Sequence, residues 1–297
     1  MIYSKSQHIF KRVAAKKIRH FALDLCFVSL GIRTGYLFDA FAISGLQQRR
    51  PALFIDVLAS LRQVVPALED VIILHEPISD QLFFVNFALL EARCARIPGL
   101  GDHPRRQDDP HGWPFFVQLS EVPTLVEFPT LIASLLREVC ARGEKSAGLS
   151  RPIALTITQP LDVVDLVPLA AALLEYPVAY VPADADQTAF LTGVPLDVYD
   201  CVVSFIGASD DEAHPEDARE HTLLKFSSPS CLSEQSTGLL PAKVMEALRD
   251  RFGPRLNAAE GQWSLACGTR RRHTIEYRSS LGSRHSSHRL APRSNRY

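Results

Sequence analysis

"DVIILHEPISDQLFFVNF", residues 70–87, carries the clearest fold signal in this chain. It contains two apolar runs, 70–76 and 81–87, whose β-branched and aromatic residues are typical of strands buried on both faces of a sheet. Proline and serine lie between the runs and predict a turn. The two strands therefore form either a hairpin or two neighbouring strands of one sheet.

Strands and helices alternate on both sides of this pair. Apolar runs predict strands at 36–39, 115–120, 152–158 and 177–182, and helical periodicity predicts helices at 51–65, 125–142 and 163–176. This alternation predicts an α/β fold with a mostly parallel or mixed sheet covered by helices. In the C-terminal third, 195–206 and 221–228 predict antiparallel strands as additions to this fold, followed by an amphipathic helix at 239–256.

The chain of 297 residues is long enough for one large or two small domains, and we favour one. Residues 20–277 hold the alternating pattern and form the predicted domain, after a basic N-terminal extension at 1–19. Residues 278–297 are rich in arginine and serine and predict a disordered tail. The aperiodic segments 97–114 and 207–220 predict loops, the second of them acidic.

The net charge of −1 conceals a segregation of charge along the chain. Residues 1–23 contain six Lys or Arg and no acid, and 270–297 contain eight Arg and one Glu. The residues between them, 24–269, hold 18 basic and 32 acidic side chains, a difference of −14. This charge argues against nucleic acid as a partner of the folded body. Any anionic partner would have to contact the two ends.

The basic N-terminus permits three interpretations. It resembles a mitochondrial presequence because it lacks acids. Apolar residues at helical spacing, which continue into the first strand, instead favour a helix that opens the fold. An amphipathic helix over 8–25 that lies on a membrane is the third alternative.

The cysteines and the hydropathy pattern predict a soluble, cytoplasmic protein. The six cysteines include no CxxC pair and no Cys/His cluster with zinc-ligand spacing, so we expect reduced, mostly structural thiols. No apolar run approaches the ~18 residues that a membrane span needs. The oligomeric state is not predicted by these features.

Asp39 is the first candidate site residue. It ends the apolar run in "GYLFDAF", residues 35–41, and ligands of open α/β sheets bind at the carboxyl ends of strands. Phosphotransfer of the haloacid-dehalogenase type requires a second Asp two positions later, where this chain has Phe41. The alternative role for Asp39 is structural, as an acceptor for backbone N–H groups of the next loop.

Three further residues follow predicted strands. His75 lies with Glu76 at the end of the run 70–76 and is a candidate general base in a pair with it, or else a structural histidine at a sheet edge. Asp184 and Asp186, in "PADAD", would hold a divalent cation together with Asp39 if the two strand ends converge, or else lie in a solvated loop. No phosphate loop, GxSxG or HExxH motif is present, so the sequence names no cofactor and no metal site beyond these candidates.

Four blocks of sequence carry a resemblance to a known family: "GYLFDAF", "VIILHEPISDQLFFVN", the block 173–199 with "LLEYPVAYV" and "LTGVPLDVY", and "LLKFSSP". In this order the chain resembles, over about 20–277, a eukaryotic family of unknown function typified by the human chromosome 1 open-reading-frame 74 protein. The resemblance implies a single compact domain. It implies no substrate, cofactor or catalytic residue.

Two functions remain open from the sequence. Because no acid/base pair or phosphate loop is evident, a non-enzymatic module that binds a protein partner is the first prediction. The alternative is a small-molecule-binding protein or an enzyme, with its site at the carboxyl ends of the strands around Asp39.

Overall fold

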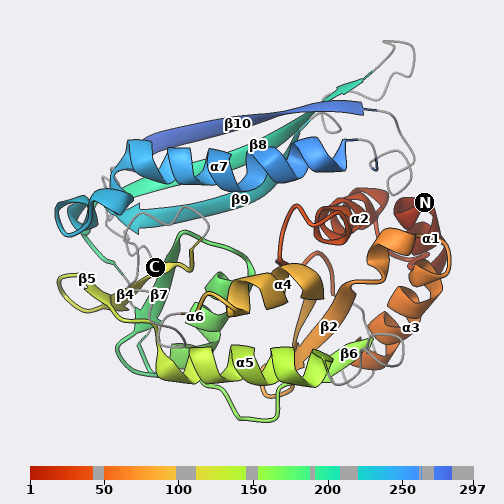
Figure 1. The fold of residues 1–297 in the computed structure, drawn as a ribbon, viewed down its shortest axis with the longest axis horizontal. Helices are drawn as coiled ribbons and strands as arrows, with labels where there is room; N and C mark the ends of the chain where they lie inside the picture. The colour runs from red at the N-terminus through yellow and green to blue at the C-terminus, as the bar shows by residue number, and fades with distance from the viewer. Residues whose placement is uncertain are drawn as a thin grey trace, which may run out of the picture.

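The computed structural model describes residues 1–42, 50–97, 112–144, 153–187, 191–207, 220–260, 262 and 271–282. Helices and strands alternate along the chain and form three sheets with helices packed around them (Figure 1). Within the described residues, two strand pairs are parallel and five are antiparallel. The predicted α/β class is confirmed, with a mixed rather than a mostly parallel arrangement.

The first sheet has the strand order β1-β3-β2-β6. Its strands are β1 (Gly35–Leu37), β2 (Val71–Glu76), β3 (Gln81–Asn86) and β6 (Ala154–Thr156). Strands β2 and β3 are the antiparallel hairpin, with Leu74 opposite Phe83, and β6 runs parallel to β2. Glu76 closes the hairpin turn because its carboxylate accepts hydrogen bonds from the backbone N–H groups of Ile78 and Ser79 at 2.8 and 2.7 Å.

Helices cover both faces of this sheet, which explains why its strands are apolar throughout. Ile73 and Phe84 pack on one face and Ile72 and Leu74 on the other. The first face is covered by α1 (Ile2–Ile9), α2 (Ala15–Ser29) and α3 (Arg50–Arg62). The second is covered by α4 (Phe87–Cys94), α5 (Thr130–Glu144) and α6 (Val163–Leu173).

Two smaller sheets complete the molecule. One has the order β5-β4-β7, formed by β4 (Phe115–Leu119), β5 (Thr124–Val126) and β7 (Val178–Pro182). The other has the order β10-β8-β9, formed by β8 (Leu196–Gly207), β9 (Glu220–Pro229) and β10 (Arg271–Gly282). This last sheet is antiparallel, as predicted for the C-terminal third, and α7 (Pro241–Ala259) lies along it (Figure 1). Short 3-10 helices occupy Pro66–Leu68, Ser230–Glu234 and Thr237–Leu239.

The two predicted chain-end segments both contribute to this fold. In the predicted extension 1–19, Ile2, Phe10 and Ile18 are buried in the same core as the first sheet. Strand β10 continues to Gly282 because it pairs with β8 as far as Leu196, so the boundary predicted at 278 lies inside a strand. Residues 283–297, and most of both predicted loops, lie outside the described residues.

A buried ionic cluster around Glu175 joins α4, α7 and the start of β1. Glu175 accepts hydrogen bonds from the backbone N–H of Thr34 at 2.7 Å and from the Arg255 guanidinium at 2.9 Å. Arg251 donates to the Glu175 carbonyl and Arg93 to the Ala172 carbonyl, both at 2.9 Å. Burial alone would raise the pKa of Glu175, but these three guanidinium groups lower it to about 2. Burial also lowers the pKa of Arg93 to about 10, since a single carboxylate is shared among three cations.

The redox state of the cysteines agrees only in part with the prediction of reduced thiols. Cys94, Cys140 and Cys201 are buried free thiols, and Cys231 is a free thiol that is partly exposed. Cys26 on α2 is disulfide-bonded, so the prediction of reduced thiols is wrong at this position.

Gly35 marks the closest approach of β1 to α6. A Cβ atom at this position would lie 2.8 Å from the backbone carbonyl oxygen of Leu173, which cannot rotate away. We expect Gly35→Ala to lower the free energy of unfolding by about 1 to 3 kcal/mol, as measured by urea denaturation. The matched control is Gly253→Ala in α7, where a Cβ meets no atom within 4 Å outside the two neighbouring residues. Because Pro254 follows and disfavours the helical conformation of a residue with a Cβ, we expect no gain in stability there, but a smaller loss than at Gly35. Equal effects at both positions would contradict this close packing.

Candidate functional site

Asp39 lies two residues after β1, at the carboxyl end of the strand as predicted, but it is exposed. Partial desolvation by the surrounding chain, followed by the negative charge of Asp24, raises the pKa of Asp39. Both carboxylates therefore belong to one electrostatic neighbourhood, although Asp39 does not line the pocket described below.

His75 is held in a different set of interactions, at the β2–β3 hairpin. Its Nε2 lies 3.3 Å from Oδ1 of Asp80, and Asp80 also pairs with Arg50 at the start of α3. No hydrogen bond or ion pair between His75 and Asp39 occurs in the described part of the chain. The structure therefore does not join these two predicted residues into one site.

Asp184 and Asp186 follow β7, which belongs to a different sheet from β1. The carboxylate of Asp184 accepts a hydrogen bond from the backbone N–H of Asp186 at 3.0 Å, as aspartates do in turns. Nowhere in the described ranges do three or more His, Cys, Asp or Glu side chains form a group suited to a metal ion. The structure therefore does not bring Asp184 and Asp186 together with Asp39, as a shared cation site would require.

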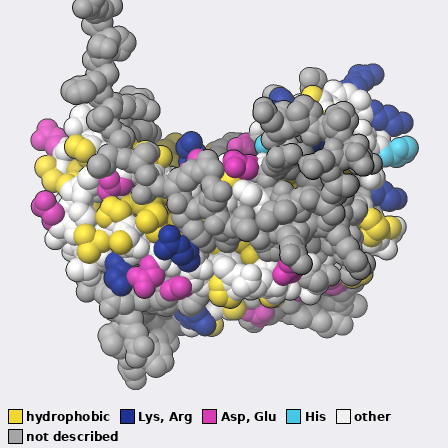
Figure 2. All heavy atoms as spheres, turned by 90° about the horizontal axis from the view of Figure 1, so that it is seen from above, with side chains coloured by type: hydrophobic (Ala, Val, Ile, Leu, Met, Phe, Trp, Pro, Cys, Tyr) yellow, Lys and Arg dark blue, Asp and Glu magenta, His cyan; other side chains and the backbone are white. Residues whose placement is uncertain are grey.

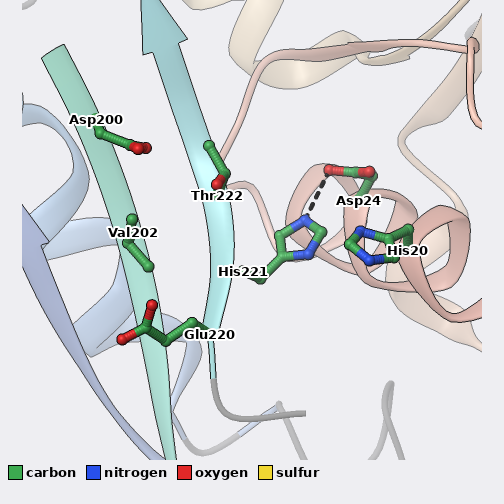
Figure 3. Close-up of a pocket in the computed structure, with 7 residues that line it drawn as sticks. All are labelled: His20, Asp24, Asp200, Val202, Glu220, His221 and Thr222. Carbon is green, nitrogen blue, oxygen red and sulfur yellow. Dashed lines mark hydrogen bonds and ion pairs between the residues drawn. The ribbon is translucent and has the colours of Figure 1, made fainter. Parts of the chain in front are cut away.

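The structure instead shows a polar pocket between α2 and the β8–β9 pair (Figure 3). Its volume is about 300 Å³, at the lower end of the range for small-molecule sites. The lining side chains are His20 and Asp24 from α2, Asp200 and Val202 from β8, and Glu220, His221 and Thr222 from β9. Three of these seven residues are carboxylates and none is Lys or Arg.

Helix α2 presents His20 and Asp24 to the pocket because residues four apart share one helix face. The adjacent face of α2 is apolar, with Phe21 and Leu25 fully buried against the first sheet. This packing fixes the helix. It thereby fixes the direction in which the two polar side chains project.

His221 is the central residue of the pocket wall. Its Nε2 lies 3.0 Å from Oδ1 of Asp24, and the same oxygen accepts a hydrogen bond from Arg33 at 3.2 Å. The imidazole is 4 % exposed and is held between the rings of Phe27 and His20, with centroid separations of 5.3 and 5.4 Å. Asp24 therefore orients the histidine, as a carboxylate does for a histidine in acid–base sites.

A β-bulge shapes the other wall. The pairing of β8 with β9 shifts between Cys201, opposite Leu224, and Val202, opposite Thr222. Leu223 is the extra residue, and both Leu223 and Leu224 are buried against α7. β-bulges often lie next to binding sites, where they redirect side chains. This bulge shifts the pairing of β8 with β9 beside the pocket residues Val202 and Thr222.

Two buried polar atoms of the pocket have no hydrogen-bond partner within the described structure. They are Nδ1 of His221 and Oδ1 of Asp200. The other oxygen of Asp200 lies 3.6 Å from Nζ of Lys225. Buried polar atoms are nearly always paired, so two on one pocket require an explanation, and a bound ligand or water supplies one.

Sequence reasoning missed every residue of this pocket. Asp24 interrupts the apolar run "FALDLCFV", and a carboxylate in a buried helix is a signal that it has a partner. His221 lies 197 residues further along the chain, so no spacing rule connects the two.

Comparison with protein-family models, with curated proteins and with solved structures found no match to this chain. In the described part of the chain, no helix has the length and apolar character that crossing a membrane requires. The class that the fold and the site define is thus an α/β protein with an acidic, histidine-containing pocket. The resemblance to a family of unknown function stays a prediction.

Proposed function

We propose that this protein binds a small organic cation, a protonated amine, in the pocket between α2 and strands β8 and β9. The observation that carries the proposal is the pair of buried, unpartnered polar atoms on that pocket, Nδ1 of His221 and Oδ1 of Asp200. An ammonium group has three N–H donors and no acceptor, so it can satisfy a carboxylate oxygen such as Oδ1 of Asp200.

The charge of the pocket supports a cation over an anion. Asp24, Asp200 and Glu220 line it without a lining Lys or Arg. Asp24 is already paired with Arg33 and His221, whereas Asp200 pairs, within the described residues, with the exposed Lys225 alone. Asp200 is therefore the carboxylate that a cationic ligand would neutralise.

The proposal predicts that a positively charged ligand stabilises the folded protein and that an uncharged analogue does not. We expect putrescine to raise the melting temperature of the full chain, whereas 1,4-butanediol, which has the same carbon skeleton without the charge, has no effect. At 100 times its dissociation constant a ligand adds about 2.7 kcal/mol to the free energy of unfolding. The measurement is thermal unfolding by fluorescence over a concentration series of each compound.

Asp200→Asn separates binding from folding. The substitution removes the charge but keeps the shape, and the unliganded variant is expected to unfold at or above the wild-type temperature because a neutral amide costs less to bury than a carboxylate. The putrescine shift is expected to disappear. Asp250→Asn, on the exposed side of α7, is the control with the same chemical change and should keep the shift. A shift retained in Asp200→Asn would overturn the proposed site.

The protein-binding module predicted from sequence stays a prediction. The large apolar side chains that the described surface exposes are spread over several elements: Ile78, Val122, Val163, Val167 and Leu240, together with Met1 and Ile9 at the N-terminus. A docking site for a protein usually requires a contiguous apolar patch. The cytoplasmic location likewise stays a prediction.

A further inference from the structure

The N-terminal helices form a strongly basic surface, which we call the basic face. Its exposed cationic residues come from α1, the following turn and the start of α2: Lys5, Lys11, Arg12, Lys16 and Lys17. Residues 1–23 themselves contain no acidic side chain. Lys, Arg and His side chains gather on the side of the molecule where the N-terminal helices lie (Figure 2).

The basic face is rigid because its helices belong to the core. Ile2 and Ile18 are at most 1 % exposed, and Phe10 between them is 5 % exposed. The apolar side of α2 is therefore committed to the first sheet, and the amphipathic membrane helix considered for 8–25 is not available for insertion. Only the polar side of these helices, with the exposed Met1 and Ile9 beside it, is left to meet a partner.

The distribution of charge favours a flat anionic partner over a nucleic acid. Residues 24–269 carry a net charge of −14, which repels a polyanion that wraps around the body. A membrane surface contacts one face only. Each Lys or Arg close to an anionic bilayer contributes about 1 kcal/mol, and exposed apolar side chains add to this by entering the interface.

We propose that the basic face docks the protein on membranes that contain anionic lipids, through lysine and arginine contacts to the headgroups. The contact is peripheral and electrostatic. It therefore weakens as the ionic strength rises, because exposed charges are screened beyond about 8 Å at physiological salt.

Sedimentation with vesicles tests the proposal on the full chain. Vesicles of phosphatidylcholine with phosphatidylserine are expected to bind the protein at low salt, and vesicles of phosphatidylcholine alone are not. Lys11→Gln combined with Lys17→Gln is expected to weaken binding about 30-fold, because two positive charges no longer meet the headgroups. Both side chains are exposed, so the melting temperature should stay unchanged.

The control removes the same charge elsewhere. Lys243→Gln combined with Arg249→Gln, both exposed on α7, is expected to keep wild-type binding. The arginine-rich residues 270–297 are the other source of positive charge, and they are intact in both variants. Equal loss in both variants, wild-type binding by the Lys11/Lys17 variant, or binding to a DNA oligonucleotide without binding to anionic vesicles would each overturn the proposal.

Discussion

Replacing Glu175 by glutamine is expected to lower the free energy of unfolding by about 3 to 5 kcal/mol, because it leaves buried guanidinium groups without their counter-charge. Glu175 is 1 % exposed, and Arg93 and Arg251 are each 7 % exposed. The carboxylate also accepts the hydrogen bond of the Thr34 backbone N–H just before β1. Urea denaturation of the wild type and the variant at neutral pH measures the loss.

The matched control is Glu138→Gln on α5, where the carboxylate pairs with Arg142 at 3.4 Å and is 36 % exposed. Exposed pairs four residues apart on a helix contribute about 0.3 to 0.5 kcal/mol, so this variant should be close to wild type. Comparable losses in the two variants would show that Glu175 does not hold the cluster together.

Acid titration gives a second, independent measurement of the same cluster. The pKa of Glu175 falls from 4.5 to about 2 on folding, so its contribution is complete above pH 4.5 and is lost as the pH falls towards 2. The difference between these values corresponds to about 3 kcal/mol. The stability gap between wild type and Glu175→Gln should therefore narrow over this interval, and a constant gap would contradict the ionic origin of the effect.

The pattern of apolar residues correctly predicted the helices and strands whose burial is the same along their whole length. The two strands expected at 70–76 and 81–87 are β2 and β3, because strands buried on both faces are apolar throughout. The structure decides between the two alternatives for this pair in favour of the hairpin. The helix expected at 125–142 begins only at Thr130, and 124–126 forms β5 instead. Pro129 explains the difference, since the residue before a proline is disfavoured in the helical region.

The pocket was beyond prediction for a different reason. Sequence rules place polar groups at strand ends, and they led to Asp39, His75, Asp184 and Asp186, which the structure leaves in separate surroundings. The pocket arises where a helix from the first part of the chain meets a sheet from the last part. Only the packing of α2 against β9 brings Asp24 and His221 together, and that packing depends on tertiary contacts that no local pattern encodes.

Phe10→Ala is expected to lower the free energy of unfolding by about 3 to 5 kcal/mol, although Phe10 lies in the segment that composition marks as an extension. Its ring packs edge-on against Phe21 and Phe41, with centroid separations of 5.9 and 5.1 Å, and lies 5.8 Å from Phe54. Removing the ring opens a cavity within this aromatic cluster. Thermal and urea denaturation of the full chain measure the cost.

Ile9→Ala is the adjacent control, since Ile9 is 36 % exposed and its truncation should change the stability by no more than about 0.5 kcal/mol. If Phe10→Ala is as stable as this control, residues 1–19 are a separable extension and the basic face has no rigid support. If it is destabilised as expected, α1 is part of the domain. A chain that begins at residue 20 would then lose Ile2, Phe10 and Ile18 from its core and should fail to fold cooperatively.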